Sequence, residues 1–338
     1  MTLKEIAQRA GVSISTVSRI LNSEDDNFAR KEVRDRVWAV VRETGYVPNA
    51  SARALKMGKD IGDSGNVGKI ACIMGRTKTT KDNPFFEQVS RAVEQQALSR
   101  GYIISHNYSV YDLSDEDIIN QINTTDVDGA VIIGRLTADA YRFIAKTYKH
   151  IVYVGRNTID ADVDQVICDG YEATKDAVEY LIGRGHTRIG YIGETTRETR
   201  YKAYKDVLRA HAIKLNTDYV SNTKQDAPGG YNGAKKILRK RDGQQLPTAA
   251  FCATDISAIA AMQYMTEAGF KIPADIAILS MDDIEISSYM TPMLSTVSMP
   301  IVEMGATAVR VLIDRMNKVH KIPRKILLPY KLIPRETT

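Results

Sequence analysis

Residues 1–22 read MTLKEIAQRAGVSISTVSRILN, and this stretch has the spacing of two short helices joined by a tight turn. Apolar side chains recur on one face of the first segment, at Leu3, Ile6, Ala7 and Ala10. Gly11 stands where a chain leaves a helix at positive φ, and Ser13 can cap the next helix. The pattern predicts a helix-turn-helix, whose second helix enters the major groove of DNA, although a purely structural helical hairpin has the same spacing.

The second helix is expected to separate buried from exposed residues. Its apolar side consists of Val17, Ile20 and Leu21. The opposite side carries Ile14, Ser15, Thr16, Ser18 and Arg19. Because the N-terminal part of a recognition helix contacts base edges, we expect Ile14, Ser15 and Arg19 to read the DNA sequence. Arg19 can donate two hydrogen bonds to one guanine.

The opening closely resembles that of the lactose repressor/galactose repressor family, T-L-x-x-[IV]-A-x-x-A-G-V-S-x-x-T-V-S-R-x-[LI]-N. The residues that fit are Thr2, Leu3, Ile6, Ala7, Ala10, Gly11, Val12, Ser13, Thr16, Val17, Ser18, Arg19, Leu21 and Asn22. The resemblance implies a transcription regulator whose headpiece binds DNA. Its predicted DNA-binding residues in the headpiece are Thr2, Ser13, Ile14, Ser15, Thr16, Ser18, Arg19 and Asn22.

A third helix is expected from Lys31 to Glu43, followed by the string YVPNASARALK at 46–56. Pro48 and the small helix formers after it predict one short helix, which is unstable alone. The family's counterpart folds when two copies meet on DNA, and the resemblance places Asn49, Ala52 and Leu55 against the DNA. Leu55 matches a leucine that wedges into the minor groove. An ordinary linker is the alternative interpretation.

Composition is typical of a soluble globular protein. The chain has 338 residues, 43% hydrophobic and 26% charged, which is enough for two or three domains. It shows no signal peptide and no apolar run of membrane-span length, so we expect a cytoplasmic protein. Residues 1–60 hold 11 Lys/Arg and 8 Asp/Glu, a net charge of +3 out of +5 for the whole chain. This concentration of positive charge suits a polyanionic partner.

From residue 68 onward, apolar strands alternate with amphipathic helical runs, as in βαβ units with parallel sheets. The expected strands are Lys69–Met74, Tyr102–Asn107, Gly129–Ile133, Ile151–Val154, Ile189–Ile192, Ala249–Ala253 and Ile276–Ser280. Helical runs include Phe86–Ser99, Ala173–Ile182, Ala234–Leu238 and Ile256–Ala268. The glycine-rich string GGYNG at 229–233 is expected to be a turn before a helix.

The resemblance to the family extends through DGYEATKDAVEYLIGRGHTRIGYIG (169–193) and ATDISAIAAMQYMTEAGFKIPADIAILSMDDI (253–284). It implies an N-terminal all-α helix-turn-helix headpiece followed by an α/β, two-lobed, periplasmic-binding-protein-like core with parallel sheets. We expect a headpiece at 1–47, a hinge helix and linker at 48–67, and an effector-binding and dimerisation core at 68–338. The expected N-lobe is 68–157 and 291–322, and the C-lobe is 158–290 and 323–338, with crossings near 157, 290 and 322.

A ligand of such a core binds at the C-terminal ends of its strands. Sugars need aromatic faces and charged hydrogen-bonding groups, and both occur at those ends. The predicted effector-binding residues are Phe85, Phe86, Arg156, Arg200, Thr254, Asp255 and Asp282. Arg200 opens RYKAY, which matches the family's R-x-x-G-[FY] except that Ala203 replaces the glycine. One of the two phenylalanines is expected to pack in the core, and Asp283 is expected to be a structural cap.

The charge of the ligand is open at this point. Arg76, Lys78 and Arg135 also follow strands, and several cations in the cleft would favour a sugar phosphate. One arginine matched by one aspartate suits a neutral sugar, which we favour.

Enzymatic motifs are lacking: the chain has no Gly-x-Ser-x-Gly, no P-loop and no His-Glu-x-x-His. We therefore expect no catalytic residues, no metal and no cofactor. The three cysteines, Cys72, Cys168 and Cys252, are far apart in apolar runs and are expected to be buried thiols.

These observations favour a homodimeric repressor of a sugar-utilisation operon that leaves a pseudo-palindromic operator when a small sugar binds. A galactose-like sugar is preferred by general resemblance only. A global regulator that needs a phosphoprotein corepressor would have the same scaffold. A sugar-binding transport protein is the third hypothesis, against which the headpiece argues. The end of the chain, KLIPRETT, has no leucine heptad for a coiled-coil tetramer.

Overall fold

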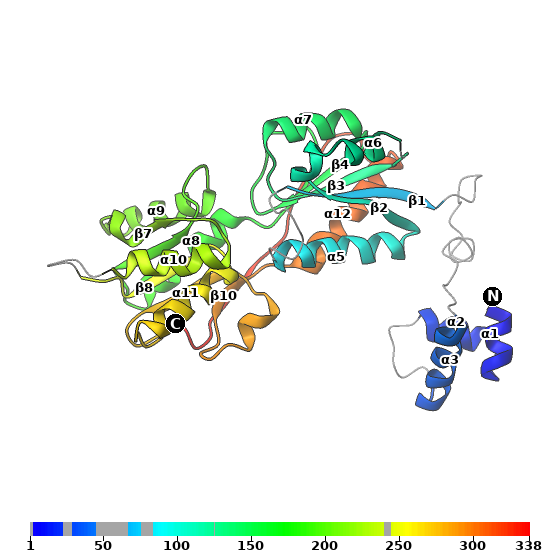
Figure 1. Cartoon of the computed structure of the whole chain (residues 1–338), viewed down its shortest axis with the longest axis horizontal. Coiled ribbons are helices and arrows are strands. Elements are labelled where there is room, and N and C mark those ends of the chain that lie inside the picture. The colour runs from blue at the N-terminus through cyan, green and yellow to red at the C-terminus, as the bar shows by residue number, and fades with distance from the viewer. Residues whose placement is uncertain (1–2, 23–28, 45–66, 76–83, 125, 240–244) are drawn as a thin grey trace. The chain divides into compact units, whose positions relative to one another are not determined.

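The computed structural model describes residues 3–22, 29–44, 67–75, 84–124, 126–239 and 245–338 (Figure 1). The chain divides into two compact units, Met1–Val67 and Gly68–Thr338. The first unit contains the helices α1 (Leu3–Ala10), α2 (Ile14–Asn22) and α3 (Lys31–Thr44). The second contains two six-stranded sheets with helices on their faces. The predicted fold class is therefore confirmed.

The three helices of the first unit bury one apolar cluster, made of Ile6, Ala7, Ala10, Val17, Ile20, Val37 and Val41. Gly11 turns the chain at a φ of 65°, as its position predicts. The Ser13 hydroxyl accepts a hydrogen bond from the backbone N–H of Thr16 at 3.1 Å, which caps α2. The predicted helix-turn-helix is thus formed. Thr2 and the predicted hinge residues Asn49, Ala52 and Leu55 lie outside the described residues, as do the side chains of Ser18 and Asn22.

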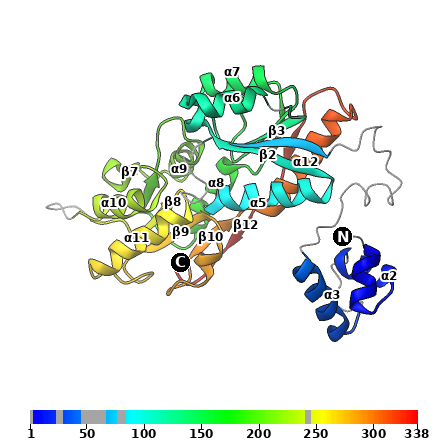
Figure 2. The same cartoon turned by 45° about the vertical axis from the view of Figure 1, so that its right-hand side comes forward.

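The first sheet defines the N-lobe, and all its neighbouring strands are parallel. Its order is β11-β5-β4-β3-β1-β2. The strands are β1 (Gly68–Met74), β2 (Tyr102–Ser109), β3 (Gly129–Ile133), β4 (Ile151–Gly155), β5 (Asp164–Ile167) and β11 (Lys325–Leu327). Its helices are α5 (Pro84–Ser99), α6 (Glu116–Thr124), α7 (Ala138–Thr147) and α12 (Ile301–Met316). Figures 1 and 2 show α6 and α7 on one face of the sheet and α5 and α12 on the other.

The second sheet defines the C-lobe, with the order β12-β10-β9-β8-β6-β7. Only β12 is antiparallel to its neighbour. The strands are β6 (Ile189–Gly193), β7 (Val220–Asn222), β8 (Ala249–Cys252), β9 (Ala277–Asp282), β10 (Ser295–Ser298) and β12 (Lys331–Ile333). Its helices are α8 (Gly170–Gly183), α9 (Thr199–Ala210), α10 (Ala227–Ile237) and α11 (Asp255–Glu267).

Continuous apolar strands explain why both sheets are parallel and covered. Every residue of β3, β4 and β6 is buried, so these strands have no solvent face. A parallel sheet with helices on both sides requires such strands, because neither face meets water. Connections of this kind bring the C-terminal ends of the parallel strands to one edge of each sheet.

The chain crosses between the lobes later than the sequence predicted. The first crossing follows β5, not residue 157, because the short strand Asp164–Ile167 adds to β4 before the chain leaves the N-lobe. The second follows β10, not residue 290, and the third lies between β11 and β12, not near residue 322. The expected lobe boundaries 157/158, 290/291 and 322/323 are therefore corrected. Each error comes from a strand of three or four residues, too short to show periodicity.

The prediction for the glycine-rich string is also wrong. The string lies inside α10 rather than in a turn before it. A Cβ at Gly230 would stand 2.1 Å from the carbonyl oxygen of Ser257, so the absence of a side chain lets α10 pack closely on α11. Close packing of two helices, and not phosphate binding, accounts for this glycine.

Candidate functional site

Two predicted effector residues meet across the lobes. Arg156 follows β4 of the N-lobe, Asp282 ends β9 of the C-lobe, and their side chains form a hydrogen-bonded ion pair. Arg156 is 8% exposed and Asp282 is 2% exposed. The guanidinium carbon also lies 3.9 Å from the ring centre of Phe85 at the start of α5. The structure thus brings together three of the predicted residues from three separate parts of the sequence.

Backbone geometry directs Asp282 into this position. Asp282 has a φ of 133° and Asp283 a φ of 56°, both in regions that residues other than glycine rarely adopt. Strain of this kind persists at ligand sites, where the surrounding structure holds it. The turn sends the two carboxylates to different partners, since Asp283 pairs with Arg335 at 2.6 Å. Asp283 therefore fixes the turn, while Asp282 faces the other lobe.

Burial raises the pKa of Asp282 to about 7, although the positive charges of Arg156 and Arg200 oppose this shift. Asp255 adds to the shift through its own negative charge. The buried carboxylate of Asp282 has Arg156 as a partner but few hydrogen bonds from water. A ligand whose hydroxyl groups donate to this carboxylate would supply the hydrogen bonds that water cannot.

Arg200 lies in α9 and is 2% exposed. Its Nε donates to Glu198 Oε1 at 2.8 Å, and its Nη1 donates to the carbonyl oxygen of Ala253 at 2.5 Å. Its Nη2 donates to Glu198 Oε2 at 3.1 Å and to Gln225 Oε1 at 2.7 Å. Burial disfavours the charged guanidinium, but the charge and hydrogen bonds of Glu198, together with Tyr191 and Asp282, raise the pKa of Arg200. These four bonds use four of its five N–H groups, which leaves one on Nη1 for a ligand.

A second pair of contacts joins the lobes. Arg135, after β3, donates from Nη1 to the carbonyl oxygen of Arg197 at 2.6 Å, and its Nη2 lies 3.6 Å from a carboxylate oxygen of Glu194. The hydroxyl of Thr199 donates to the side-chain oxygen of Asn157. The strand ends of the two lobes are therefore in direct contact around Arg156 and Asp282.

Thr254 and Asp255 are engaged within their own lobe. Thr254 caps α11 by accepting from the backbone N–H of Ser257. Asp255 is fully buried and accepts from the hydroxyls of Ser280 and Thr296 and from the backbone N–H of Ile284. These bonds give both residues a structural role that does not need a ligand, although their strand-end positions predict that both contact one.

The two phenylalanines have different surroundings. Phe85 lies under Arg156 and is 1% exposed. Phe86 packs against Gly134, whose φ is 82°, and an added Cβ there would stand 2.7 Å from the Phe86 ring. The rings meet edge to face with centres 5.4 Å apart. One of the two was expected to pack in the core, and in this structure both do.

Sequence reasoning missed Glu194, Glu198 and Gln225. Glu198 is 3% exposed, and it caps α9 as well as pairing with Arg200. A glutamate two residues before an arginine at a helix start is the only signal in the sequence, and it is a common one. Gln225 comes from the loop before α10, and its place beside Arg200 depends on the tertiary fold.

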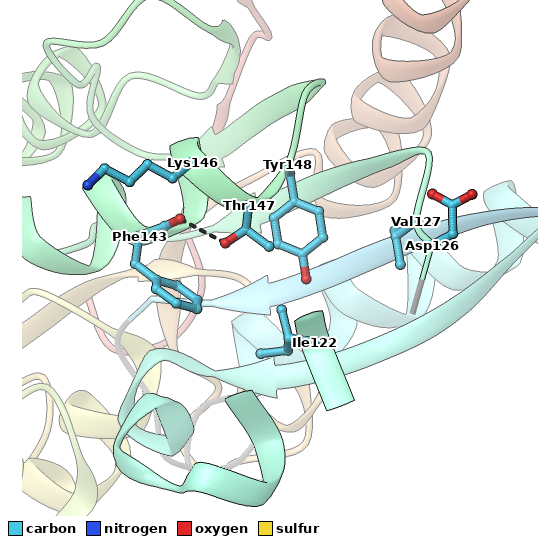
Figure 3. A pocket seen from close by; sticks show the side chains of 7 residues that line it. All are labelled: Ile122, Asp126, Val127, Phe143, Lys146, Thr147 and Tyr148. Atoms are coloured by element: carbon cyan, nitrogen blue, oxygen red, sulfur yellow. Dashed lines mark hydrogen bonds between the residues drawn. The ribbon is translucent and has the colours of Figure 1, made fainter. Parts of the chain in front are cut away.

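A surface pocket of about 480 Å³ lies elsewhere on the N-lobe (Figure 3). It is lined by Ile122, Asp126, Val127, Phe143, Lys146, Thr147 and Tyr148, from α6, α7 and the segment before β3. None of the predicted effector residues lines it. The Tyr148 hydroxyl accepts from Tyr108 at 3.3 Å, and Thr147 donates to the carbonyl oxygen of Phe143 at 2.9 Å, so these polar groups are engaged within the lobe.

On the helix-turn-helix unit, Ile14, Ser15 and Arg19 are exposed on α2. Ile14 is 42% exposed, so its apolar side chain is accessible for contact with a base edge. The hydroxyls of Ser15 and Thr16 both bond that of Ser13, at 2.7 and 2.8 Å.

Other chemistry is limited in the described part of the chain. The three cysteines are free and buried, and burial raises the pKa of the Cys72 thiol to about 11. Within the described ranges, no cluster of three or more His, Cys, Asp or Glu side chains could hold a metal ion. No helix there is long and apolar enough to span a membrane.

The state of Asp282 predicts a pH dependence that an asparagine variant lacks. An unfolded aspartate titrates near about 3.9, so the folded protein binds the extra proton between that value and about 7. The resulting stabilisation is complete below the unfolded pKa and is lost as the pH rises through the folded pKa. We expect the thermal midpoint of the wild type to fall relative to that of Asp282→Asn as pH rises from about 5 to about 7. Above about pH 7 the difference between the two midpoints should stay constant. Parallel curves throughout would contradict the raised pKa.

Comparison with known proteins gives two family matches. The model for bacterial regulatory proteins of the lacI family matches residues 2–49, and that for a periplasmic binding protein-like domain matches residues 178–338. The HTH-type transcriptional repressor PurR of Yersinia pestis bv. Antiqua (strain Antiqua) is 29% identical over 345 residues, covering 99% of this chain and 96% of the relative.

Two solved structures cover the whole chain. One is the transcriptional regulator CelR in complex with cellobiose, with a TM-score of 0.72, 23% identity and full coverage of both chains. The other is a lac repressor dimer bound to operator and the anti-inducer ONPF, with a TM-score of 0.67 and 23% identity, covering 100% of this chain and 99% of that one. At this level of identity the structures show a shared fold.

Proposed function

The chain belongs to the lacI family of bacterial regulatory proteins and is a DNA-binding transcriptional repressor, and we propose that a neutral sugar bound between its lobes releases it from its operator. The observation that carries the proposal is the pairing of charges at the strand ends. Arg135 faces Glu194, Arg156 faces Asp282, and Arg200 faces Glu198.

Because each guanidinium has its own carboxylate, the described part of this site has no surplus positive charge for a phosphate. Such pairs offer both donors and acceptors to a polyol, whose hydroxyl groups need both. Phe85 packs under Arg156 and helps to hold its guanidinium in place. The cellobiose in the CelR structure supports the same ligand class on the same fold. We infer that Asp282, Arg156 and Arg200 are the principal ligand contacts.

The ion pair between Arg156 and Asp282 gives a physical route for regulation. It links the lobes directly, so a ligand that takes over either partner changes how the lobes meet. Such a ligand can shift the protein between two states only by its difference in affinity for them. In this proposal two copies of the chain bind the two halves of the operator, and the sugar favours the state that binds DNA poorly.

A thermal-shift screen tests the ligand class directly. Neutral mono- and disaccharides, their phosphates and nucleobases are added separately to the full chain. A ligand at 100 times its Kd stabilises the folded state by about 2.7 kcal/mol, which gives a clear rise in Tm. We expect a neutral sugar to give the largest rise. A larger shift with a sugar phosphate or a nucleobase would overturn the neutral-sugar proposal.

A further inference from the structure

The C-terminal part of the chain carries a run of positive charge that the effector site does not use. From Arg315 to Arg335 there are seven Lys/Arg and no Asp/Glu. Arg315 pairs with Asp164 at 2.8 Å, and Arg335 pairs with Asp283. Four exposed cations remain in the turn between α12 and β11 and at the start of β11, namely Lys318, Lys321, Arg324 and Lys325. We call these four residues the basic corner.

Buried contacts hold the basic corner in place. The carboxylate of Asp164, which is fully buried, accepts from His320 at 3.0 Å and from the backbone N–H of Arg324 at 2.7 Å. Arg315 also donates to the carbonyl oxygen of Lys321. The turn is therefore fixed to the sheet at both ends, while its cations point to solvent. The fold therefore fixes the spacing of these four cations before any partner binds.

Two carboxylates near the basic corner already have other partners. Asp164 is taken by Arg315 and His320, and Asp128, near His150, accepts from the backbone N–H of Lys69 at 2.7 Å. Burial lowers the pKa of His150, and the nearby charges of Lys149, Arg315 and Lys318 add to this shift. Among the described residues, no carboxylate forms an ion pair with any member of the basic corner.

The basic corner lies at the end of the N-lobe sheet where the second unit begins in the sequence, at Gly68. The strands of this sheet are parallel, so the turn before β11 and the first residue of β1, Gly68, are at the same end of the sheet. Four strand spacings separate β11 from β1, or about 19 Å across the sheet. That span is shorter than one turn of B-DNA, about 34 Å.

We propose that the basic corner is a second, sequence-independent DNA-binding surface that contacts backbone phosphates beside the operator. Lys and Arg on a rigid surface bind DNA mainly by displacing its condensed counterions, and this needs no base recognition. The helix-turn-helix unit would then select the site, and the core would add affinity for the flanking duplex. This assignment does not depend on the nature of the effector.

The test compares two fourfold variants of the full chain that lose the same charge. The first carries Lys318→Gln, Lys321→Gln, Arg324→Gln and Lys325→Gln. The matched control carries Lys214→Gln, Lys235→Gln, Lys236→Gln and Lys271→Gln, all exposed positions of the C-lobe. An operator is first selected with the wild type from a random duplex pool. Binding is then measured by fluorescence anisotropy over a range of salt, without effector, on a minimal duplex and on one with long flanks.

We expect the wild type and the control to bind the flanked duplex more tightly than the minimal one, and the basic-corner variant to lose that preference. For each phosphate that the variant no longer neutralises, the slope of log K against log salt should fall by about 0.9, or by about 3.6 if all four cations act. Equal thermal midpoints of the two variants would show that both fold. An unchanged slope and flank preference in the basic-corner variant, or equal effects in the control, would overturn the proposal.

Discussion

The Asp282→Asn variant is expected to bind the effector about ten- to a hundredfold more weakly than the wild type. Hydrogen bonds to a charged group are worth about 1.5–3 kcal/mol, and asparagine keeps the shape but loses the charge that faces Arg156. Operator affinity without effector should change much less, because the asparagine oxygen can still accept a hydrogen bond from Arg156 across the lobes and Asp282 lies outside the DNA-binding unit. The result would be a repressor that remains on DNA in the presence of inducer.

The adjacent residue supplies the control. Asp283→Asn changes the same chemical group, but Asp283 pairs with Arg335 and fixes the turn. Calorimetry with the effector found in the thermal-shift screen should show near wild-type affinity for Asp283→Asn and a large loss for Asp282→Asn. Wild-type affinity in Asp282→Asn would mean that the effector binds elsewhere.

Loss of Arg19 is expected to reduce operator binding far more than binding to random DNA. Arg19 is exposed in the last turn of α2, where it can donate two hydrogen bonds to a guanine. A bidentate contact of this kind is worth roughly 1–3 kcal/mol of discrimination between bases. Arg19→Ala should therefore lower the ratio of specific to non-specific affinity by roughly five- to 150-fold.

Arg36→Ala is a suitable comparison for this effect. Arg36 is also exposed, but it lies on α3, and its loss changes the net charge by the same amount. Both affinities should fall slightly and together in this variant. If Arg19→Ala shows the same equal losses on operator and random DNA, Arg19 contacts phosphate rather than bases.

The helix-turn-helix could be predicted closely because its determinants are local. The apolar spacing, the positive φ at Gly11 and the cap at Ser13 all act within a few residues, and all are present in the structure. The lobe boundaries could not be placed so well. Whether a strand such as Asp164–Ile167 joins one sheet or the other depends on contacts far along the chain, here with β4 and β11.

The candidate site was predictable in part. Strand-end positions predicted that Arg156 and Asp282 face one site, because parallel strands bring such ends together, and the structure pairs the two. Arg200 was predicted from the family resemblance. The partners of Arg200 were not predicted. Gln225 and the carbonyl oxygen of Ala253 reach it through tertiary packing, and the spacing of Glu198, two residues before it, is too common to single out. Asp255 also follows a strand, and it is held by Ser280, Thr296 and Ile284 inside the C-lobe, so its predicted ligand contact remains a prediction.

The central claim is that sugar binding between the lobes and operator binding oppose each other. The most direct measurement is the anisotropy of a labelled operator held by the wild type while the sugar is titrated, with sugar affinity measured by calorimetry on free and operator-bound protein. We predict that the sugar releases the operator, and that operator weakens sugar binding by the same factor by which sugar weakens operator binding. Saturation of the core with sugar while operator affinity stays unchanged would contradict the account.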